Sequence, residues 1–311
     1  MNLRDLRELL SAIENNNLKR IQQLIDSDVE LVEGLTPQGE RPLESAIESE
    51  NITIIKELLE AGAHPDYGGW TSPLDAAVRT GNPQIVKLLL EAGAEPNLIV
   101  AGNLPLTTAA FDGYLDIVKI LVNEGADVNL FDNNTGTTLE VAVLNGHYEI
   151  FNYLAPLTST NLKKWSETSS LFSSVRNGNT KAINFLVESG ININQFYEDE
   201  DKDTCLMYAV RENQLSSVEV LLKWKADVNI QNSRGQTALM LASQFKSREE
   251  SRDSDAPKII KIKIKIIKLL IKANANVNTQ DNNRSTALSL AKEIGNTEVI
   301  QLLIEAGAKE D

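Results

Sequence analysis

The sequence predicts an all-α repeat fold, an α/α solenoid built from about nine helix-turn-helix units. A leucine followed three residues later by a small residue recurs every 31 to 35 residues over most of the chain. A second helical stretch with an apolar stripe follows, and a five-letter phrase such as GAEPN or GADVN closes several copies. Self-similarity at such a period is typical of stacked repeats, in which one unit cannot bury its apolar face alone.

The aligned leucines set the boundaries of the repeats. An irregular first copy lies around Leu9, and a long interval before the last leucine indicates an insertion at 246–262. The other leucines are Leu43, Leu74, Leu106, Leu139, Leu171, Leu206, Leu239 and Leu288. We expect a single domain over residues 1–311 whose first and last copies act as caps. Its units are the cap 1–34, the repeats 35–66, 67–98, 99–131, 132–164, 165–198, 199–231 and 232–280, and the cap 281–311.

The first helix of each unit carries start and stop signals. In Ser72-Pro73-Leu74 the serine supplies an N-cap oxygen, and the proline follows at the first helical position, where its missing N–H is harmless. Glycine tolerates the left-handed conformation that closes helices. We therefore expect these helices to end near Gly81, Gly113, Gly146, Gly178 and Gly295.

The second helix is predicted from apolar residues at helical spacing. Examples are 83–93 and 115–125, and in the first of these Ile85, Val86, Leu88 and Leu89 form the stripe. The five-letter phrase then ends the helix and begins a connector to the next unit. The phrases are GAHPD at 62–66, GAEPN at 93–97, GADVN at 125–129, KADVN at 225–229 and NANVN at 274–278.

This combination of period, start motif and closing phrase resembles the ankyrin repeat over nearly the whole chain. The resemblance implies two antiparallel helices per repeat with a short β-hairpin or loop finger, stacked into a curved solenoid. The family's histidine after the aligned leucine is absent. Glu44, Asp75, Thr107, Glu140 and Ser289 stand there instead.

Two further departures from the repeat pattern carry structural expectations. The segment YLAPLTSTNLKKW lacks the closing phrase, so we expect altered stacking, with a kink between two subdomains, around 155–170. Lys225 replaces the closing glycine and costs about 1 kcal/mol if it adopts the left-handed conformation, which Asn274 accepts more readily.

Composition narrows the function classes. Acidic residues outnumber basic ones by 44 to 30, and the net charge of −14 disfavours general affinity for nucleic acids or anionic membranes. No apolar run approaches the roughly 20 residues that cross a bilayer. The single cysteine excludes an internal disulfide, and the first residues lack a secretory signal pattern. We expect a cytoplasmic monomer.

The sequence offers no catalytic constellation. His64 and His147 fall at structural positions of the repeat, and Cys205 occupies a semi-buried helix start with no histidine to activate it. The acidic segment 197–203 lacks the central glycine and terminal glutamate of a calcium loop, so we interpret it as a solvated finger. No phosphate-binding or zinc motif occurs. We expect no enzyme activity, no small-molecule substrate, no cofactor and no metal.

By the resemblance, partner contacts fall on finger tips and on the exposed ends of the first helices. Apolar side chains at helix ends and aromatic residues on fingers favour a binding surface there, because such residues often contribute most of the binding energy of an interface. The alternative is that finger side chains pack only on neighbouring fingers. The expected partner-binding residues are Tyr67, Trp70, Arg79, Asn103, Phe111, Asp112, Phe131, Leu144, Asn145, Arg176, Phe196, Tyr197, Arg211, Gln244 and Phe245.

The stretch IIKIKIKIIKLLIK alternates isoleucine and lysine like a strand, but its register aligns 266–272 with a second helix. Lys261, Lys265, Lys268 and Lys272 then share one solvated face. The sequence favours a non-catalytic scaffold or adaptor that binds a protein partner of unknown identity through its concave face and fingers, as an inhibitor or assembly factor. The alternative is a nucleic-acid or anionic-membrane module using Lys258–Lys272.

Overall fold

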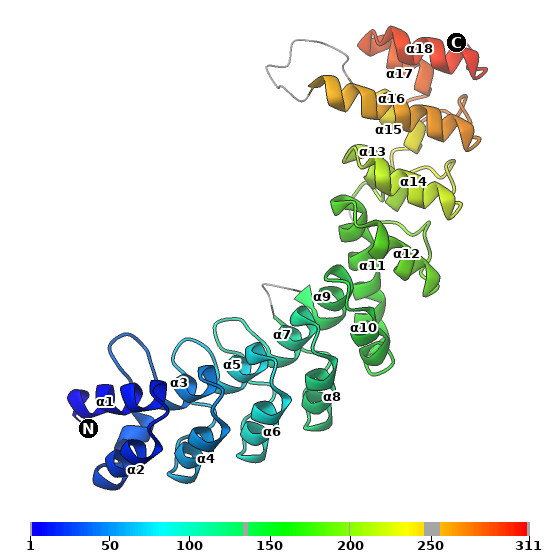
Figure 1. Ribbon diagram of the computed structural model, residues 1–311. Helices are drawn as coiled ribbons and strands as arrows, with labels where there is room; N and C mark the ends of the chain where they lie inside the picture. The colour runs from blue at the N-terminus through cyan, green and yellow to red at the C-terminus, as the bar shows by residue number, and fades with distance from the viewer. Residues whose placement is uncertain (1, 133–135, 199, 246–255, 310–311) are drawn as a thin grey trace. The chain divides into compact units, whose positions relative to one another are not determined.

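The computed structural model describes residues 2–132, 136–198, 200–245 and 256–309 and divides into two compact units, Met1–Lys163 and Lys164–Asp311 (Figure 1). The predicted all-α repeat fold is confirmed, because pairs of short helices follow one another along the described chain. The boundary between the units falls inside the segment 155–170, where the closing phrase is missing.

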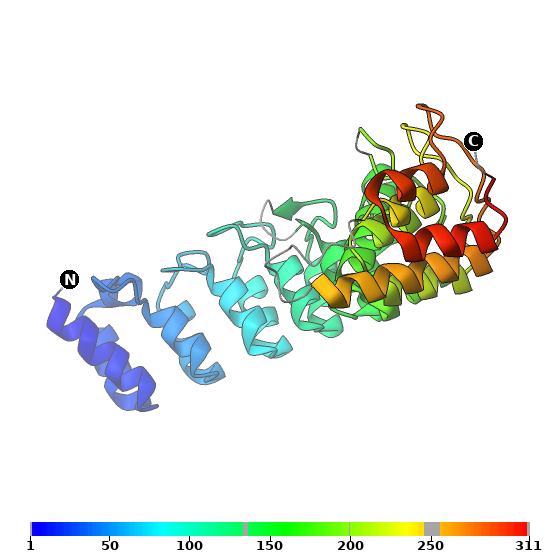
Figure 2. The same cartoon turned by 90° about the horizontal axis from the view of Figure 1, so that it is seen from above.

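Unit 1 is a two-layer stack of helix pairs. The first helices of successive pairs, α1, α3, α5, α7 and α9, pack in series, and each packs on the second helix of its own pair. Figure 2 shows the finger loops of this unit along one side of its helices. The helices are α1 (Leu3–Glu14), α2 (Leu18–Ser27), α3 (Pro42–Glu48), α4 (Ile52–Glu60), α5 (Pro73–Thr80), α6 (Pro83–Glu91), α7 (Pro105–Asp112), α8 (Leu115–Asn123), α9 (Thr138–Leu144) and α10 (Tyr148–Leu154), with a 3₁₀ turn η1 (Val29–Glu33) after α2.

Unit 2 repeats the same arrangement. Helices α13, α15 and α17 pack in series, as do α12, α14, α16 and α18 on the other layer. The helices are α12 (Thr180–Glu188), α13 (Cys205–Arg211), α14 (Leu215–Lys223), α15 (Ala238–Ser243), α16 (Ala256–Lys272), α17 (Ala287–Ile294) and α18 (Thr297–Glu305).

Helix α11 (Thr160–Asn177) differs from the other first helices. It has 18 residues, whereas α5 and α7 have eight each. Between Thr160 and Asn177 the sequence has no glycine or proline that would end one helix and start another, so one helix runs through the whole range. This lengthening lies where altered stacking was expected.

The predicted helix ends are confirmed. The Ser72 side chain accepts a hydrogen bond from the Asp75 amide, and Thr137 and Thr204 cap their helices in the same way. The five predicted glycines all have positive φ, and so do Lys225 at +61° and Asn274 at +64°. A lysine therefore occupies a backbone conformation that favours glycine.

The closing phrases are joined from repeat to repeat by a ladder of asparagine side chains. Asn97 Oδ1 accepts the Asp127 amide at 2.8 Å, and its Nδ2 donates to the Gly125 carbonyl at 3.0 Å. In unit 2, Asn229 Oδ1 accepts the Asn276 amide at 2.7 Å, and Asn278 continues the pattern to the end of the chain. The last residue of a phrase thus bonds to the backbone of the following repeat, which for Asn97 and Asn229 is the next phrase itself.

The fingers are short. Strands β1 (Phe131–Asp132) and β2 (Gly136–Thr137) pair antiparallel, with Phe131 opposite Thr137. Single bridges join Val100 to Asn103 and Phe196 to Thr204.

The core lies between the two helix layers of each unit. Ile85, Val86 and Leu89 of α6 are fully buried, as predicted, and Leu88 is half-buried. The expected helix over 266–272 is confirmed, because α16 includes it, and residues 246–255 of the expected insertion lie outside the described residues. Within the described ranges no helix combines the length and the apolar character needed to span a bilayer.

Candidate partner-binding surface

Aromatic side chains stand exposed on the fingers and helix ends. Trp70 is 75% exposed and Phe111 54%, and four more of the predicted aromatic residues are exposed in the same regions. These four are Tyr67, Phe131, Phe196 and Tyr197. Aromatic side chains in water at projecting positions are the kind of group that anchors protein interfaces.

The predicted positions at the ends of the first helices divide into two groups. Leu144 and Phe245 were expected in water but are half-buried, so the prediction of exposed apolar side chains there is wrong for both. The finger residue Asn103, also predicted to contact the partner, is half-buried as well. The remaining polar positions are exposed: Arg79, Asp112, Asn145, Arg176, Arg211 and Gln244.

The finger that carries Trp70 is fixed on the preceding repeat. The Gly69 amide donates to the Glu44 carboxylate at 2.7 Å, and the Arg41 guanidinium donates to the Gly68 carbonyl at 3.1 Å. A Cβ at position 69 would lie 1.8 Å from the Gly39 carbonyl oxygen, so only glycine allows this approach. The Trp70 indole is held by its own N–H, which donates to the Gln38 carbonyl at 3.1 Å.

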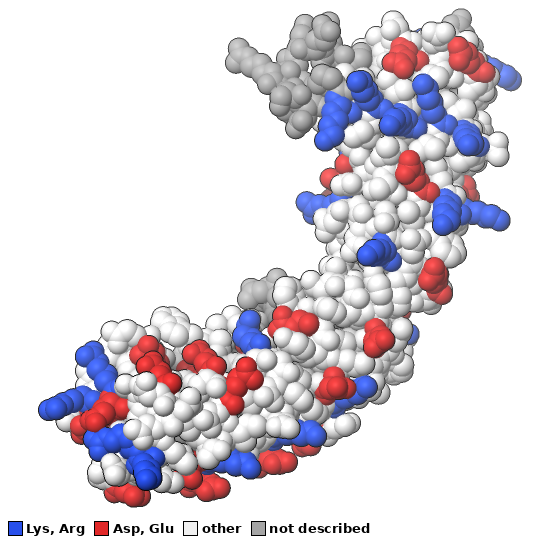
Figure 3. All heavy atoms as spheres, viewed as in Figure 1, with Lys and Arg blue, Asp and Glu red and all other residues white. Residues whose placement is uncertain are grey.

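A pocket of about 630 Å³ lies beneath this finger, against α1, α3 and α5. We call it the N-terminal pocket. Its lining includes Trp70 and Arg79, and five glutamates: Glu14, Glu40, Glu44, Glu48 and Glu50. Figure 3 shows acidic side chains gathered on the visible face of unit 1. The volume falls within the range of ordinary ligand-binding pockets.

The electrostatics of the N-terminal pocket centre on Glu44. Burial raises the pKa of Glu44 above its usual value, hydrogen bonds from Gly69 and Thr71 lower it in part, and the charge of Glu48 raises it again. The two arginines of the lining, Arg41 and Arg79, form ion pairs with carboxylates other than Glu44. Arg79 pairs with the buried Asp75 at 2.9 Å, and Arg41 lies 3.5 Å from Glu33.

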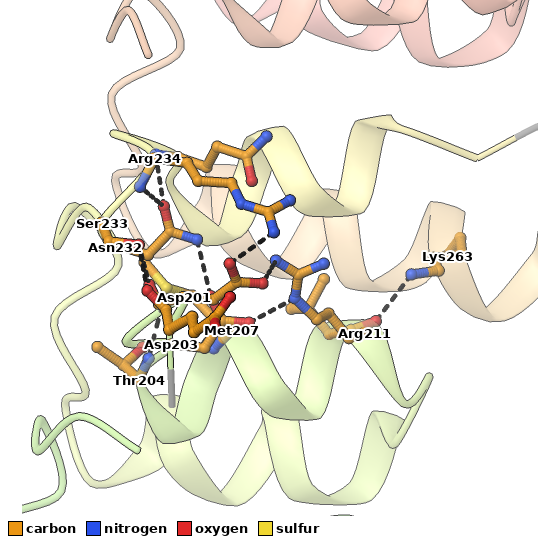
Figure 4. Close-up of polar contacts among 12 residues, drawn as sticks. Asp201, Asp203, Thr204, Met207, Arg211, Asn232, Ser233, Arg234 and Lys263 are labelled. Carbon is orange, nitrogen blue, oxygen red and sulfur yellow. Dashed lines mark hydrogen bonds and ion pairs between the residues drawn. The ribbon is translucent and has the colours of Figure 1, made fainter. Parts of the chain in front are cut away.

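In unit 2 the acidic finger is folded back onto the protein. Asp203 is buried and accepts from Asn232 at 2.8 Å and from Arg211, while Asp201 pairs with Arg234 at 2.7 Å (Figure 4). The prediction of a solvated acidic finger is therefore wrong for Asp203. Its charge is compensated by an arginine from α13, a helix that follows it directly in sequence.

Lys263 of α16 is a buried cation beside this network. Its Nζ donates to the Val210 carbonyl at 2.7 Å, near the C-terminal end of α13 (Figure 4). Burial lowers the pKa of Lys263 to about 8, and the positive charge of Arg211 contributes in the same direction.

The opposite side of α16 presents a row of lysines. Ile264, Ile266, Ile267 and Leu270 are buried, which confirms the predicted register of this helix. The predicted face of Lys261, Lys265, Lys268 and Lys272 is exposed, together with Lys258. In Figure 3 basic side chains line this helix.

The histidines and the cysteine take structural positions. His64 stacks on the Tyr67 ring with 4.1 Å between centroids, and His147 Nε2 lies 2.9 Å from the Phe111 carbonyl oxygen. Cys205 is buried, and burial raises the pKa of its thiol. Across the described ranges, no three His, Cys, Asp or Glu side chains are grouped so that they could hold a metal ion.

Sequence reasoning missed the N-terminal pocket and its glutamates. Glu44 is visible in the sequence as the residue that replaces the family's histidine. The signal that could have found the pocket is the run of acids on one helix face, Glu44 and Glu48, followed a repeat later by the Gly-Gly-Trp finger.

Comparison with protein-family models supplies the family relationship. A model of three ankyrin repeats matches residues 9–100, 74–164, 155–232 and 171–252. A model of a single ankyrin repeat matches residues 234–282.

Proposed function

This chain belongs to the ankyrin-repeat family, whose repeats are generally protein–protein interaction modules, and from that premise we propose a non-catalytic scaffold or adaptor for one protein partner. The partner is held on the first-helix face and the finger tips. The chain acts in the cytoplasm, where it inhibits its partner or assists its assembly.

One observation carries this proposal: aromatic side chains project into water from the fingers and from the end of a first helix. Phe111, in α7, and Phe131, on the β1 finger, both lie in the repeat 99–131 of unit 1 and are both about half exposed. Aromatic side chains bury a large apolar area when a partner covers them, and such residues often contribute most of the binding energy of an interface.

The test is capture of proteins from the native cell by the full chain and by the double variant Phe111→Ala with Phe131→Ala. We expect the variant to retain less than about a tenth of the principal captured protein, because two aromatic anchors are removed. The melting transition should remain nearly unchanged, since both side chains are exposed.

A matched control is Ile304→Ala, which removes an equally exposed apolar side chain from α18. This variant should capture the same proteins as the unmodified chain. Equal capture by all three proteins would refute the assignment of the fingers and first-helix ends as the binding surface.

A second candidate function rests on the exposed lysines of α16. Because the apolar side of the helix is buried in unit 2, contact with nucleic acid or an anionic membrane surface would be electrostatic. Binding to DNA or to anionic vesicles at low salt, lost in the triple variant Lys261→Glu, Lys265→Glu and Lys268→Glu, is the expected result. No binding at low salt would dismiss this candidate.

A further inference from the structure

The N-terminal pocket combines a rigid aromatic wall with a defined volume. Trp70 is 75% exposed, yet its indole N–H donates to Gln38, and its ring lies against Gly39. A Cβ at position 39 would lie 2.8 Å from the indole nitrogen, so the ring is seated on a glycine that leaves room for it. The indole is therefore a fixed platform with a face available to a ligand.

Glu44 is held in place by hydrogen bonds, and neither it nor Glu14 or Glu48 has a cationic partner among the described residues. Glu44 is oriented by Gly69 at 2.7 Å and Thr71 at 3.4 Å, both from the finger that carries Trp70. No lysine or arginine among the described residues forms an ion pair with Glu14, Glu44 or Glu48. The orienting bonds come from neutral donors, so the negative charge is left for a ligand to compensate.

The arginines in the lining cannot supply that compensation. Arg79 is bound to Asp75, which also accepts the Thr108 hydroxyl at 2.5 Å and is almost completely buried. Arg41 donates to the Glu33 carbonyl at 2.8 Å and to the Gly68 carbonyl at 3.1 Å. Turning Arg79 toward the glutamates would leave the buried Asp75 without its cation, and turning Arg41 would break bonds to the neighbouring repeats.

We propose that the N-terminal pocket binds a short basic segment of the partner protein, with an arginine or lysine side chain stacked on Trp70 and paired with Glu44 and Glu48. This inference rests on the proposed function and specifies the partner's chemistry. A cation over an indole face is attracted by the ring quadrupole, and guanidinium pairs well with carboxylates.

Charge and size exclude other occupants. Phosphate backbones and anionic lipid headgroups would meet glutamates with no free cation, so they are repelled. A bare metal ion would need converging carboxylates at short range, and no such group exists in the described part of the chain. A volume of about 630 Å³ accommodates several atoms of peptide beyond one side chain.

The experiment measures binding of a fluorescein-labelled peptide, Gly-Arg-Gly-Lys-Gly-Arg-Gly, to the full chain by anisotropy at about 50 and 150 mM salt. Trp70→Ala and the double variant Glu44→Gln with Glu48→Gln should each weaken binding by about tenfold. Trp70→Phe keeps an aromatic face and should restore most of the affinity that Trp70→Ala loses.

A matched control separates the pocket from the net charge of the protein. The double variant Glu91→Gln with Glu124→Gln removes the same charge from exposed positions at the ends of α6 and α8. It should bind the peptide as the unmodified chain does. A peptide with citrulline in place of arginine, which is neutral and similar in shape, should bind at least about tenfold more weakly.

Hydrogen exchange then locates the site. Peptide binding should slow exchange of the amides around 38–48 and 68–72 in the unmodified chain. Equal loss of affinity in the Glu91/Glu124 control, unchanged affinity in the Trp70 and Glu44/Glu48 variants, or protection only elsewhere would overturn the proposal. If the Phe111/Phe131 variant still lost its captured partner, each of these outcomes would refute the basic-peptide site and leave the proposed scaffold function standing. Failure of the site and failure of the proposed function are therefore distinguishable.

Discussion

His147 Nε2 lies 2.9 Å from the carbonyl oxygen of Phe111. His147 directly precedes α10, and Phe111 lies near the C-terminal end of α7 in the preceding repeat, so the histidine gives a hydrogen-bond partner to a carbonyl at the end of that helix. The imidazole also occupies the space beside Gly113, where a Cβ would lie 2.4 Å from the ring. The last carbonyls of a helix have no partner within it, and this histidine supplies one from the neighbouring repeat.

We predict that His147→Ala lowers the free energy of unfolding by about 1 kcal/mol, because one hydrogen bond between repeats is lost. Urea denaturation followed by circular dichroism measures the change. His64→Ala serves as the comparison, since His64 is exposed on a finger, and it should have a clearly smaller effect. Equal stability of the His147 variant and the unmodified chain would contradict a structural role.

Lys225→Gly should stabilise the protein by about 1 kcal/mol, because the lysine has φ of +61° in a region where a Cβ is strained. Asn274→Gly is the matched substitution at the equivalent position, with φ of +64°. Its gain should be smaller, since asparagine tolerates this conformation. The difference between the two urea midpoints tests the argument, and a stability loss in Lys225→Gly would refute it.

The buried Lys263 predicts a rise of stability with pH. Its pKa is about 8 in the folded protein and ordinarily 10.5. Between these values the unfolded chain binds more protons than the folded protein, so the free energy of unfolding increases with pH. The shift corresponds to at most about 3 kcal/mol. Below about pH 8 the cost of holding the buried charge is fully present.

Lys263→Met should remove this dependence. Urea denaturation between about pH 7 and 10 should show a smaller rise in the variant than in the unmodified chain. Lys265→Met, on the exposed side of the same helix, should retain the full rise. Parallel pH profiles for all three proteins would contradict the buried titration.

Cys205 should be unreactive in the folded protein. The thiol is completely buried, burial raises its pKa, and the thiolate is the reactive form. Modification by a chromogenic disulfide reagent at about pH 8 should be at least about a hundredfold slower than in denaturing urea, since labelling requires local opening. Comparable rates in the two conditions would show that the helix start around Cys205 is open to solvent.

The sequence predicted the parts of the fold that are set locally. The N-cap at Ser72, the left-handed glycines and the helical register of α16 all follow from backbone preferences and side-chain periodicity over a few residues. The same reasoning missed the N-terminal extension of α11, because no single residue there marks a start.

The candidate surface was predicted less completely. Exposure of Phe111 and Trp70 could be expected from their positions in the repeat. The half-burial of Leu144 and Phe245 could not, because it depends on which parts of the folded protein pack against each side chain. The pairing of Asp203 with Arg211 and Asn232 likewise depends on a finger folding back in space.

By itself, the sequence determined the period, the two helices of each repeat and the places where they begin and end, because dihedral preferences and apolar spacing act within a few residues. The tertiary structure alone decided which side chains from different repeats meet. Glu44 reaches Gly69, Asp75 reaches Thr108, and Asn97 reaches Asp127 because stacking brings residues about thirty positions apart into contact. Those contacts also decide which charges are paired: the two arginines of the N-terminal pocket pair with Glu33 and Asp75, and no ion pair of the described residues involves Glu14, Glu44 or Glu48.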